Sequence, residues 1–102
     1  MYRWDAKEYH RNSENQKRWA LGLLAQISWK GNESVLDVGC GNGRVTALIA
    51  AKVPKGKVLG VDSSRDMVDF ASGFYKRQRK RLSFKRKDAC RLGMREAFDV
   101  IF

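Results

Sequence analysis

The chain has 102 residues and a formal net charge of +10, from 21 Lys and Arg against 11 Asp and Glu. This length predicts a single domain with a thin hydrophobic core. No apolar run approaches the roughly 20 residues that span a bilayer, and the first residues carry no apolar signal segment. We therefore expect a cytoplasmic protein with no membrane partner. The two cysteines, Cys40 and Cys90, and the single histidine, His10, lack metal-ligand spacing, so we expect reduced thiols and no bound metal.

The first 30 residues are predicted to form an arm followed by a helix. Residues 1–12 are polar and aromatic and are typical of an arm. Ser13 stands three residues before Gln16, a capping-box pattern that predicts a helix from there to about Trp29. Apolar residues recur along this helix and predict a stripe that docks on a sheet. The stripe consists of Trp19, Ala20, Leu23, Leu24 and Ile27.

The next stretch combines a strand, a glycine loop and a helix. Residues 35–38 are apolar except for Asp37 and predict a buried strand. The glycines at 39, 41 and 43 allow a tight turn and let the backbone approach a ligand closely, because no Cβ is present. Residues 44–53 then predict a helix with its apolar side chains on one face. The combination predicts a nucleotide-type site at the carboxyl end of a parallel strand.

The glycine spacing separates two kinds of nucleotide fold. A dinucleotide-binding loop would have its third glycine at position 44, but Arg44 stands there, which weighs against a dehydrogenase. The run Asp37-Val38-Gly39-Cys40-Gly41-Asn42-Gly43 resembles the first motif of class I S-adenosylmethionine-dependent methyltransferases. The resemblance extends over most of the chain. It is closest to the small-molecule carboxylate methyltransferases, such as the trans-aconitate and juvenile hormone acid methyltransferases.

This resemblance implies an α/β fold, a Rossmann-like doubly wound parallel sheet of strand order 3-2-1-4 with helices on both faces. The complete fold has seven strands, and residues 98–102 read as the fourth, so we expect only the N-terminal half. Residues 1–30 would form an arm and helix acting as a lid, and residues 31–102 the cofactor-binding half-domain. The implied reaction moves the methyl group of S-adenosyl-L-methionine to a small-molecule acceptor, with a carboxylate as one candidate. The alternatives are a non-catalytic S-adenosylmethionine-binding fragment and a methyltransferase that binds or modifies nucleic acid.

A second strand, residues 57–62, ends in an acid. Asp62 lies 23 residues after Gly39, close to the roughly 20 expected for an acid that binds both ribose hydroxyls. A carboxylate suits that task because it offers two acceptors to two adjacent donors. The alternative is that Asp62 caps a helix. Ser63 and Ser64 are expected to cap the helix that follows.

That helix is predicted to bury a stripe at i, i+3, i+4 and i+7. Its members are Met67, Phe70, Ala71 and Phe74. The resemblance places a hydrophobic side chain near Met67 against adenine, whereas the competing interpretation is a methionine of the core.

Basic residues concentrate after this helix. Residues 76–95 hold ten Lys and Arg and one acid, whereas the other 82 residues carry eleven bases and ten acids. The basicity is therefore local. Three uses stay open: binding of nucleic-acid phosphates with Tyr75 and Phe84 stacking on bases, attraction of an anionic acceptor such as a polycarboxylate, or a solvated end of a helix that keeps the domain soluble.

The last part of the chain reads as two strands around a basic segment that contains a single acid, Asp88. Residues 82–85 alternate like a third strand, and Asp88 follows. The resemblance implies that the Asp88-Ala89-Cys90 segment binds adenine, with Asp88 accepting from the amine. Asp88 could instead be a charge partner of Arg86 or Arg91. The fourth strand has an exposed edge, which predicts self-association, and its Asp99 is expected to have no catalytic role.

The resemblance thus implies a set of ligand-binding residues. The cofactor set is Asp37, Gly39, Cys40, Gly41, Asn42, Asp62, Ser63, Met67, Asp88, Ala89 and Cys90. Tyr9 and Gln16 would close over the cofactor or hold the acceptor, although Tyr9 can equally pack and Gln16 can equally cap. No general base is identified, and His10 is expected to be a surface residue.

Overall fold

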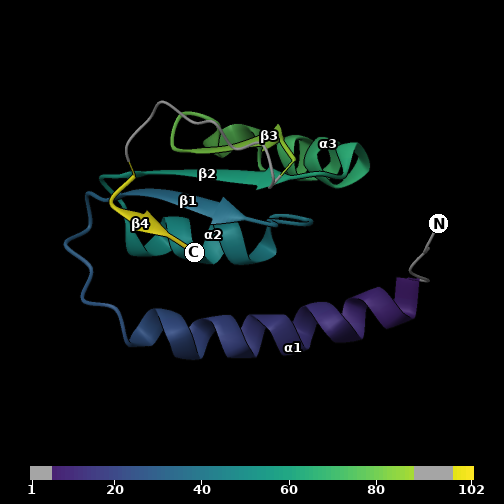
Figure 1. Ribbon diagram of the computed structural model, residues 1–102, viewed down its shortest axis with the longest axis horizontal. Helices are drawn as coiled ribbons and strands as arrows, with labels where there is room; N and C mark the ends of the chain where they lie inside the picture. Colours follow the sequence, from purple (N-terminus) through teal and green to yellow (C-terminus); the bar gives the residue numbers. More distant parts are fainter. Residues whose placement is uncertain (1–5, 89–97) are drawn as a thin grey trace.

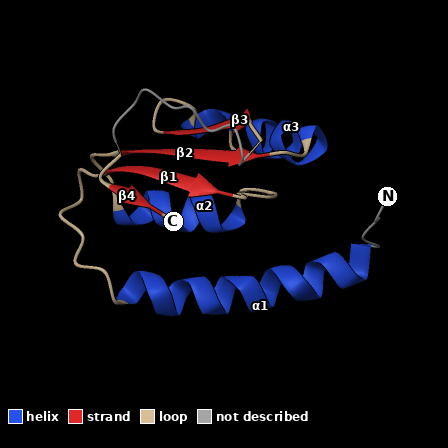
Figure 2. Cartoon of the chain, viewed as in Figure 1, coloured by secondary structure: helices blue, strands red, loops and turns tan. Residues whose placement is uncertain are grey.

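A parallel sheet of four strands organises the computed structural model, which describes residues 6–88 and 98–102, with side chains from residue 14 onward (Figures 1 and 2). The strand order β3-β2-β1-β4 confirms the predicted order 3-2-1-4. The strands are β1 Ser34–Val38, β2 Lys57–Asp62, β3 Leu82–Arg86 and β4 Val100–Ile101. The helices are α1 Ala6–Ala25, α2 Arg44–Lys52 and α3 Arg65–Phe74, with a 3-10 turn, η1, at Lys76–Gln78.

The register of the strands places the main core on one face of the sheet. Val35 pairs with Val58, and Val58 pairs with Leu82, so these three side chains project from the same face. All three are buried, together with Ile49 of α2 and Leu24 of α1. Because successive crossovers between adjacent parallel strands are right-handed, α2 and α3 lie on the same side of the sheet.

The opposite face carries a smaller apolar cluster. It consists of Leu36, Leu59 and Val61, with Val38 and Phe98 packed against them. Within residues 6–88 and 98–102, no helix belongs to this cluster. Helices on both faces therefore stay a prediction, because the connection between β3 and β4 lies largely outside the described residues.

Helix α1 differs from the predicted arm and capped helix. It begins at Ala6 and ends at Ala25, so Ser13 lies inside the helix and the proposed capping box is wrong. The stretch from Ala6 contains no proline and no glycine before Gly22, so nothing in it interrupts helical geometry. The helix packs mainly on α2, with Ala20 and Leu24 buried. Trp19 of the expected docking stripe is instead 70% exposed.

Helix α3 is rotated relative to its predicted orientation. Val68 and Ala71 are buried, whereas Phe70 and Phe74 are 54% and 69% exposed, so the predicted stripe is wrong for both phenylalanines. Ala71 faces the glycine loop, since a Cβ built on Gly43 would lie only 3.1 Å from the Cβ of Ala71. The helix therefore turns its small residue toward the loop and its two large rings outward.

Candidate functional site

The glycine loop after β1 has a backbone that only glycine adopts without strain. Gly39, Gly41 and Gly43 have φ angles of +74°, +53° and +85°. The loop is tied to the end of β2, since the amides of Gly39 and Cys40 both donate to the carbonyl of Val61, at 2.8 and 3.0 Å. The glycines thus let the chain turn sharply and keep its backbone close to the neighbouring strand.

The carboxylate of Asp62 joins the loop to the start of α3. Its Oδ2 accepts from the amide of Gly41 at 2.9 Å, and its Oδ1 accepts from the amide of Ser64 at 2.8 Å. The Ser64 hydroxyl in turn accepts from the amide of Met67 at 3.3 Å, so Ser64 is the helix cap that the sequence predicted. Each carboxylate oxygen keeps acceptor capacity for a further donor. The ribose role of Asp62 remains a prediction.

Asp37 is a buried acid beneath the loop. Its side chain accepts from the hydroxyl of Thr46 on α2, at 2.7 Å, and the residue is 4% exposed. Burial raises the pKa of Asp37 to about 6, the Thr46 hydrogen bond opposes the rise, and the charge of Asp62 adds to it. A group that stabilises the ionised form, such as a cation in the cavity, would lower this pKa.

Cys40 is buried between the loop and β2. A Cβ built on Gly60 would lie 2.9 Å from the Cβ of Cys40, so the side chain fills the space that Gly60 leaves open. Burial, together with the charges of Asp37 and Asp62, raises the pKa of the thiol to about 12. The thiol is therefore protonated at neutral pH and is a poor nucleophile.

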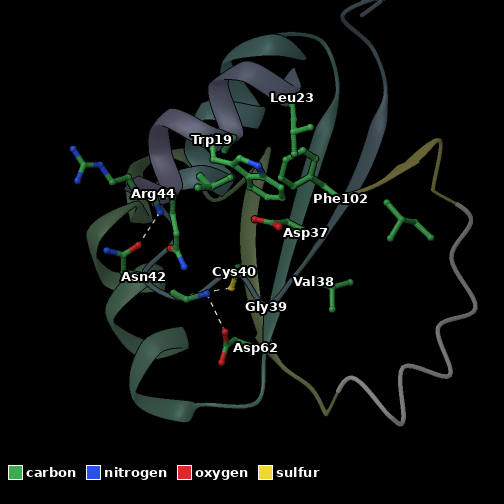
Figure 3. A pocket seen from close by; sticks show the side chains of 15 residues that line it. Trp19, Leu23, Asp37, Val38, Gly39, Cys40, Asn42, Arg44, Asp62 and Phe102 are labelled. Atoms are coloured by element: carbon green, nitrogen blue, oxygen red, sulfur yellow. Dashed lines mark hydrogen bonds between the residues drawn. The ribbon is translucent and has the colours of Figure 1, made fainter. Parts of the chain in front are cut away.

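A cavity of about 720 Å³ opens above the loop, between the sheet and α1 (Figure 3). Its floor is formed by the end of β1 and the glycine loop, and the indole of Trp19 and the ring of Phe102 stand over the Asp37 carboxylate. The lining residues are Gln16, Trp19, Ala20, Leu23, Asp37, Val38, Gly39, Cys40, Gly41, Asn42, Arg44, Val45, Asp62, Ile101 and Phe102. The wall facing the loop is thus largely apolar.

A second hollow of about 160 Å³ lies on the other side of the loop. It shares Val38, Gly39 and Asp62 with the larger cavity, so the two meet across these residues. No atom lies within 4 Å of a Cβ built on Gly39, which leaves open space at this junction. Its remaining lining residues are Val61, Ser63, Lys87 and Asp88.

The structure brings most of the predicted ligand-binding residues together. The large cavity holds Gln16, Asp37, Gly39, Cys40, Gly41, Asn42 and Asp62, and the second hollow adds Ser63 and Asp88. Met67 is partly buried and lines neither of them. Ala89, Cys90 and the side chain of Tyr9 lie outside the described residues. Asp99 accepts from the amide of Ser34 at the start of β1, away from the loop.

Sequence reasoning missed the apolar wall of the cavity. The sequence pattern predicts Trp19 and Leu23 in a stripe that docks on the sheet, and Phe102 only in a strand. The width of the apolar stripe on α1 could have indicated this wall. Ala20 and Leu24 alone make the core contact of the helix, so its other apolar residues can line a cavity. Arg44 also lines the cavity and forms an ion pair with Glu14 of α1. That pair connects the glycine-loop helix to the helix above the cavity.

No described helix is both long and apolar enough to cross a membrane. In the same part of the chain, no group of three or more His, Cys, Asp or Glu residues is arranged to hold a metal ion.

The fold and the loop define a Rossmann-like nucleotide-binding domain, and comparison with known proteins gives its family. Residues 35–102 match the family model described as a methyltransferase domain. The chain belongs to the class I S-adenosylmethionine-dependent methyltransferase family. The predicted fold class and the resemblance stated above are thereby confirmed.

Curated relatives and a solved structure agree with this assignment. The chain is 30% identical over 98 residues to a putative methyltransferase, 235L, of Invertebrate iridescent virus 6, covering 96% of this chain and 36% of that protein. It is 41% identical over 68 residues to trans-aconitate 2-methyltransferase of Rhodopseudomonas palustris strain BisB18, covering 67% and 27%. A structure of coclaurine N-methyltransferase bound to N-methylheliamine and SAH matches with a TM-score of 0.68 and 25% identity, covering 98% and 28%. The chain therefore spans about a third of the length of its relatives.

Proposed function

We propose that this chain forms the S-adenosylmethionine-binding part of a methyltransferase that acts on a small-molecule acceptor. The observation that carries the proposal is the pair of hollows that meet across Gly39 and Asp62. An elongated ligand with a central ribose fits this shape, because the sugar would lie over Asp62 while one end occupies each hollow. The similar structure of coclaurine N-methyltransferase, which is bound to SAH, supports the same type of ligand.

The residues present fit this cofactor in chemistry as well as in shape. The open space at Gly39 allows a ligand to pass over the backbone, which any side chain at that position would obstruct. Asp62 has acceptor capacity left for two hydroxyls, and Asp37 provides a buried negative charge next to the large cavity. The cofactor carries a sulfonium and an ammonium group, so the two acids Asp37 and Asp62 are appropriate surroundings.

Each residue then has a defined task. The glycine loop brings backbone groups close to the amino-acid end of the cofactor, and Asp62 accepts from the ribose. Asp88, which lines the second hollow together with Ser63, would accept from the adenine amine. When bound, the cofactor supplies an electrophilic methyl group, and the protein contributes by holding it in line with an acceptor.

The acceptor would enter the large cavity from the side of α1. Gln16 lines that cavity and can hydrogen-bond a polar group of the acceptor, including a carboxylate, whereas Trp19 and Phe102 provide apolar contact. The trans-aconitate relative supports a carboxylate acceptor, although it covers only part of this chain. In this proposal α1 acts as the lid, because it lies over the loop and is held there in part by the Arg44–Glu14 ion pair.

Calorimetry of binding tests the cofactor assignment. We expect the chain to bind S-adenosylhomocysteine and not NAD, and we expect Asp62→Asn to weaken binding about ten-fold or more, since a charge-assisted hydrogen bond contributes about 1.5–3 kcal/mol. Asp69→Asn is the matched control, because Asp69 is an exposed acid on α3 outside both hollows. NAD binding, or unchanged affinity in the Asp62 variant, would contradict the proposal. Binding of the methyl donor without methyl transfer to any tested acceptor would favour the alternative, a non-catalytic S-adenosylmethionine-binding fragment.

A further inference from the structure

We propose that the edge of the domain next to α3 binds single-stranded nucleic acid. The proposal rests on a basic surface beside two exposed, stacked phenylalanine rings, and it does not depend on methyl transfer. We call this surface the basic edge. It is made up of Lys76, Arg77, Arg79, Lys80, Lys85, Arg86 and Lys87, with Phe70 and Phe74 alongside.

The basic edge comes from one segment of the chain that contains no acidic residue. Residues 76–87 contain eight Lys and Arg and no Asp or Glu. Six of the eight are exposed, and Arg81 and Lys87 are half-buried. Arg81 turns inward and donates to the carbonyl of Val53 at 2.8 Å. β3 is an outer strand of the described sheet, so these residues run along one side of the domain from the end of α3 (Figure 1). The last of them, Lys87, lines the second hollow.

Two aromatic rings lie exposed at the start of this surface. Phe70 and Phe74 have ring centroids 5.7 Å apart and an interplanar angle of 22°, so they form a stacked pair on the outer face of α3. Tyr75 meets Phe74 edge-on at 4.8 Å and holds it in place from the side of the core. Aromatic rings next to a track of cations are the combination that binds single strands, because bases stack on the rings while phosphates meet the cations.

Simpler explanations cover only part of this arrangement. Charges on an outer strand prevent unwanted strand pairing, which explains Lys85 and Arg86. Cations after a helix oppose its dipole, which explains Lys76 and Arg77. Neither explains two large rings kept in water on a ten-residue helix. An anionic membrane also fits poorly, because interfacial helices need a broad apolar face, whereas α3 exposes Asp66 and Asp69 beside the rings.

Fluorescence anisotropy with an oligo(dT) of about 20 nucleotides tests the electrostatic part. If four phosphates are contacted, affinity should fall about fifty-fold between about 50 and 200 mM salt. Arg77→Glu combined with Lys80→Glu should weaken binding more than about ten-fold and flatten the salt dependence. The matched control is Arg18→Glu with Lys30→Glu, an equal charge change at exposed residues away from the basic edge, which should have little effect. Equal losses in both double variants would overturn a localised site.

Truncation of the rings tests the stacking part. Phe70→Ala combined with Phe74→Ala should weaken oligo(dT) binding about ten-fold while leaving binding of a duplex of the same length unchanged. Leu21→Ala, another exposed apolar residue, is the control. Because both rings are exposed, the variant should keep the wild-type melting temperature. Tighter binding to duplex than to oligo(dT), or ring-dependent binding to phosphatidylserine–phosphatidylcholine vesicles but not to oligo(dT), would overturn the proposal.

Discussion

Asp37→Asn should stabilise the ligand-free protein at neutral pH while weakening cofactor binding. In the folded protein, burial raises the pKa of Asp37 from 3.8 to about 6. The folded state therefore binds a proton more tightly than the unfolded state. The stability contribution of this proton is present below the unfolded pKa and is lost as pH rises through the folded pKa.

The size of the effect follows from the shift. A pKa difference of about two units between the folded and unfolded states corresponds to about 3 kcal/mol. Above about pH 6, ionised Asp37 destabilises the folded state by about this amount. Asparagine has no charge to desolvate, and its carbonyl oxygen can still accept from the Thr46 hydroxyl. Its amide faces a cavity in which water can hydrogen-bond to it. We therefore expect up to about 3 kcal/mol of added stability at pH 7 and almost none near pH 4.

Chemical denaturation at several pH values measures this difference directly. The wild type should lose stability relative to Asp37→Asn between about pH 4 and pH 6, whereas Asp69→Asn should follow the wild type. In the same variant, affinity for S-adenosylmethionine should fall, because the substitution removes a buried negative charge that would attract the cationic groups of the cofactor. An Asp37→Asn protein that is less stable at pH 7, or a stability difference that does not change with pH, would refute the reasoning.

Three further predictions concern the loop, the thiol and the edge of the sheet. Gly43→Ala should destabilise the fold by about 1–3 kcal/mol, because it forces a φ of +85° on alanine and places a Cβ 2.7 Å from the Phe84 ring. Urea denaturation would measure this loss, and an unchanged unfolding midpoint would contradict it. Cys40 should resist iodoacetamide in the folded protein at pH 8, since its thiol pKa is about 12, and should react only in denaturant; mass spectrometry would detect early modification. Ile101→Lys should reduce any self-association seen by light scattering, because Ile101 is 69% exposed on the outer strand β4.

The sequence predicted the sheet and the glycine loop well because their signals are unambiguous. Buried parallel strands read as short apolar runs, and the bounds of β2 agree with prediction at both ends. The loop glycines are required by their positive φ angles, and Asp62 stands at the end of the next strand, where parallel topology brings it back to the loop. Local pattern and tertiary contact agree at these positions.

The helices were predicted less well, because the same residues satisfy more than one pattern. Ser13 and Gln16 match a capping box, yet the pattern is equally tolerated inside a long helix such as α1. On α3, Phe70 and Phe74 have the spacing of a buried stripe, but so do Val68 and Ala71. In the structure Ala71 faces the glycine loop, and that tertiary contact is not visible from the sequence of α3 alone.

The two amides that hold the Asp62 carboxylate have a consequence for recognition. A loop already fixed to β2 and α3 before any ligand arrives has little freedom left to lose on binding. Association should therefore demand only a small ordering entropy from this part of the site, and a ligand that matches the fixed spacing is favoured over one that needs the loop to rearrange. Selectivity among adenosine compounds would then come from rigidity rather than from closure of the loop.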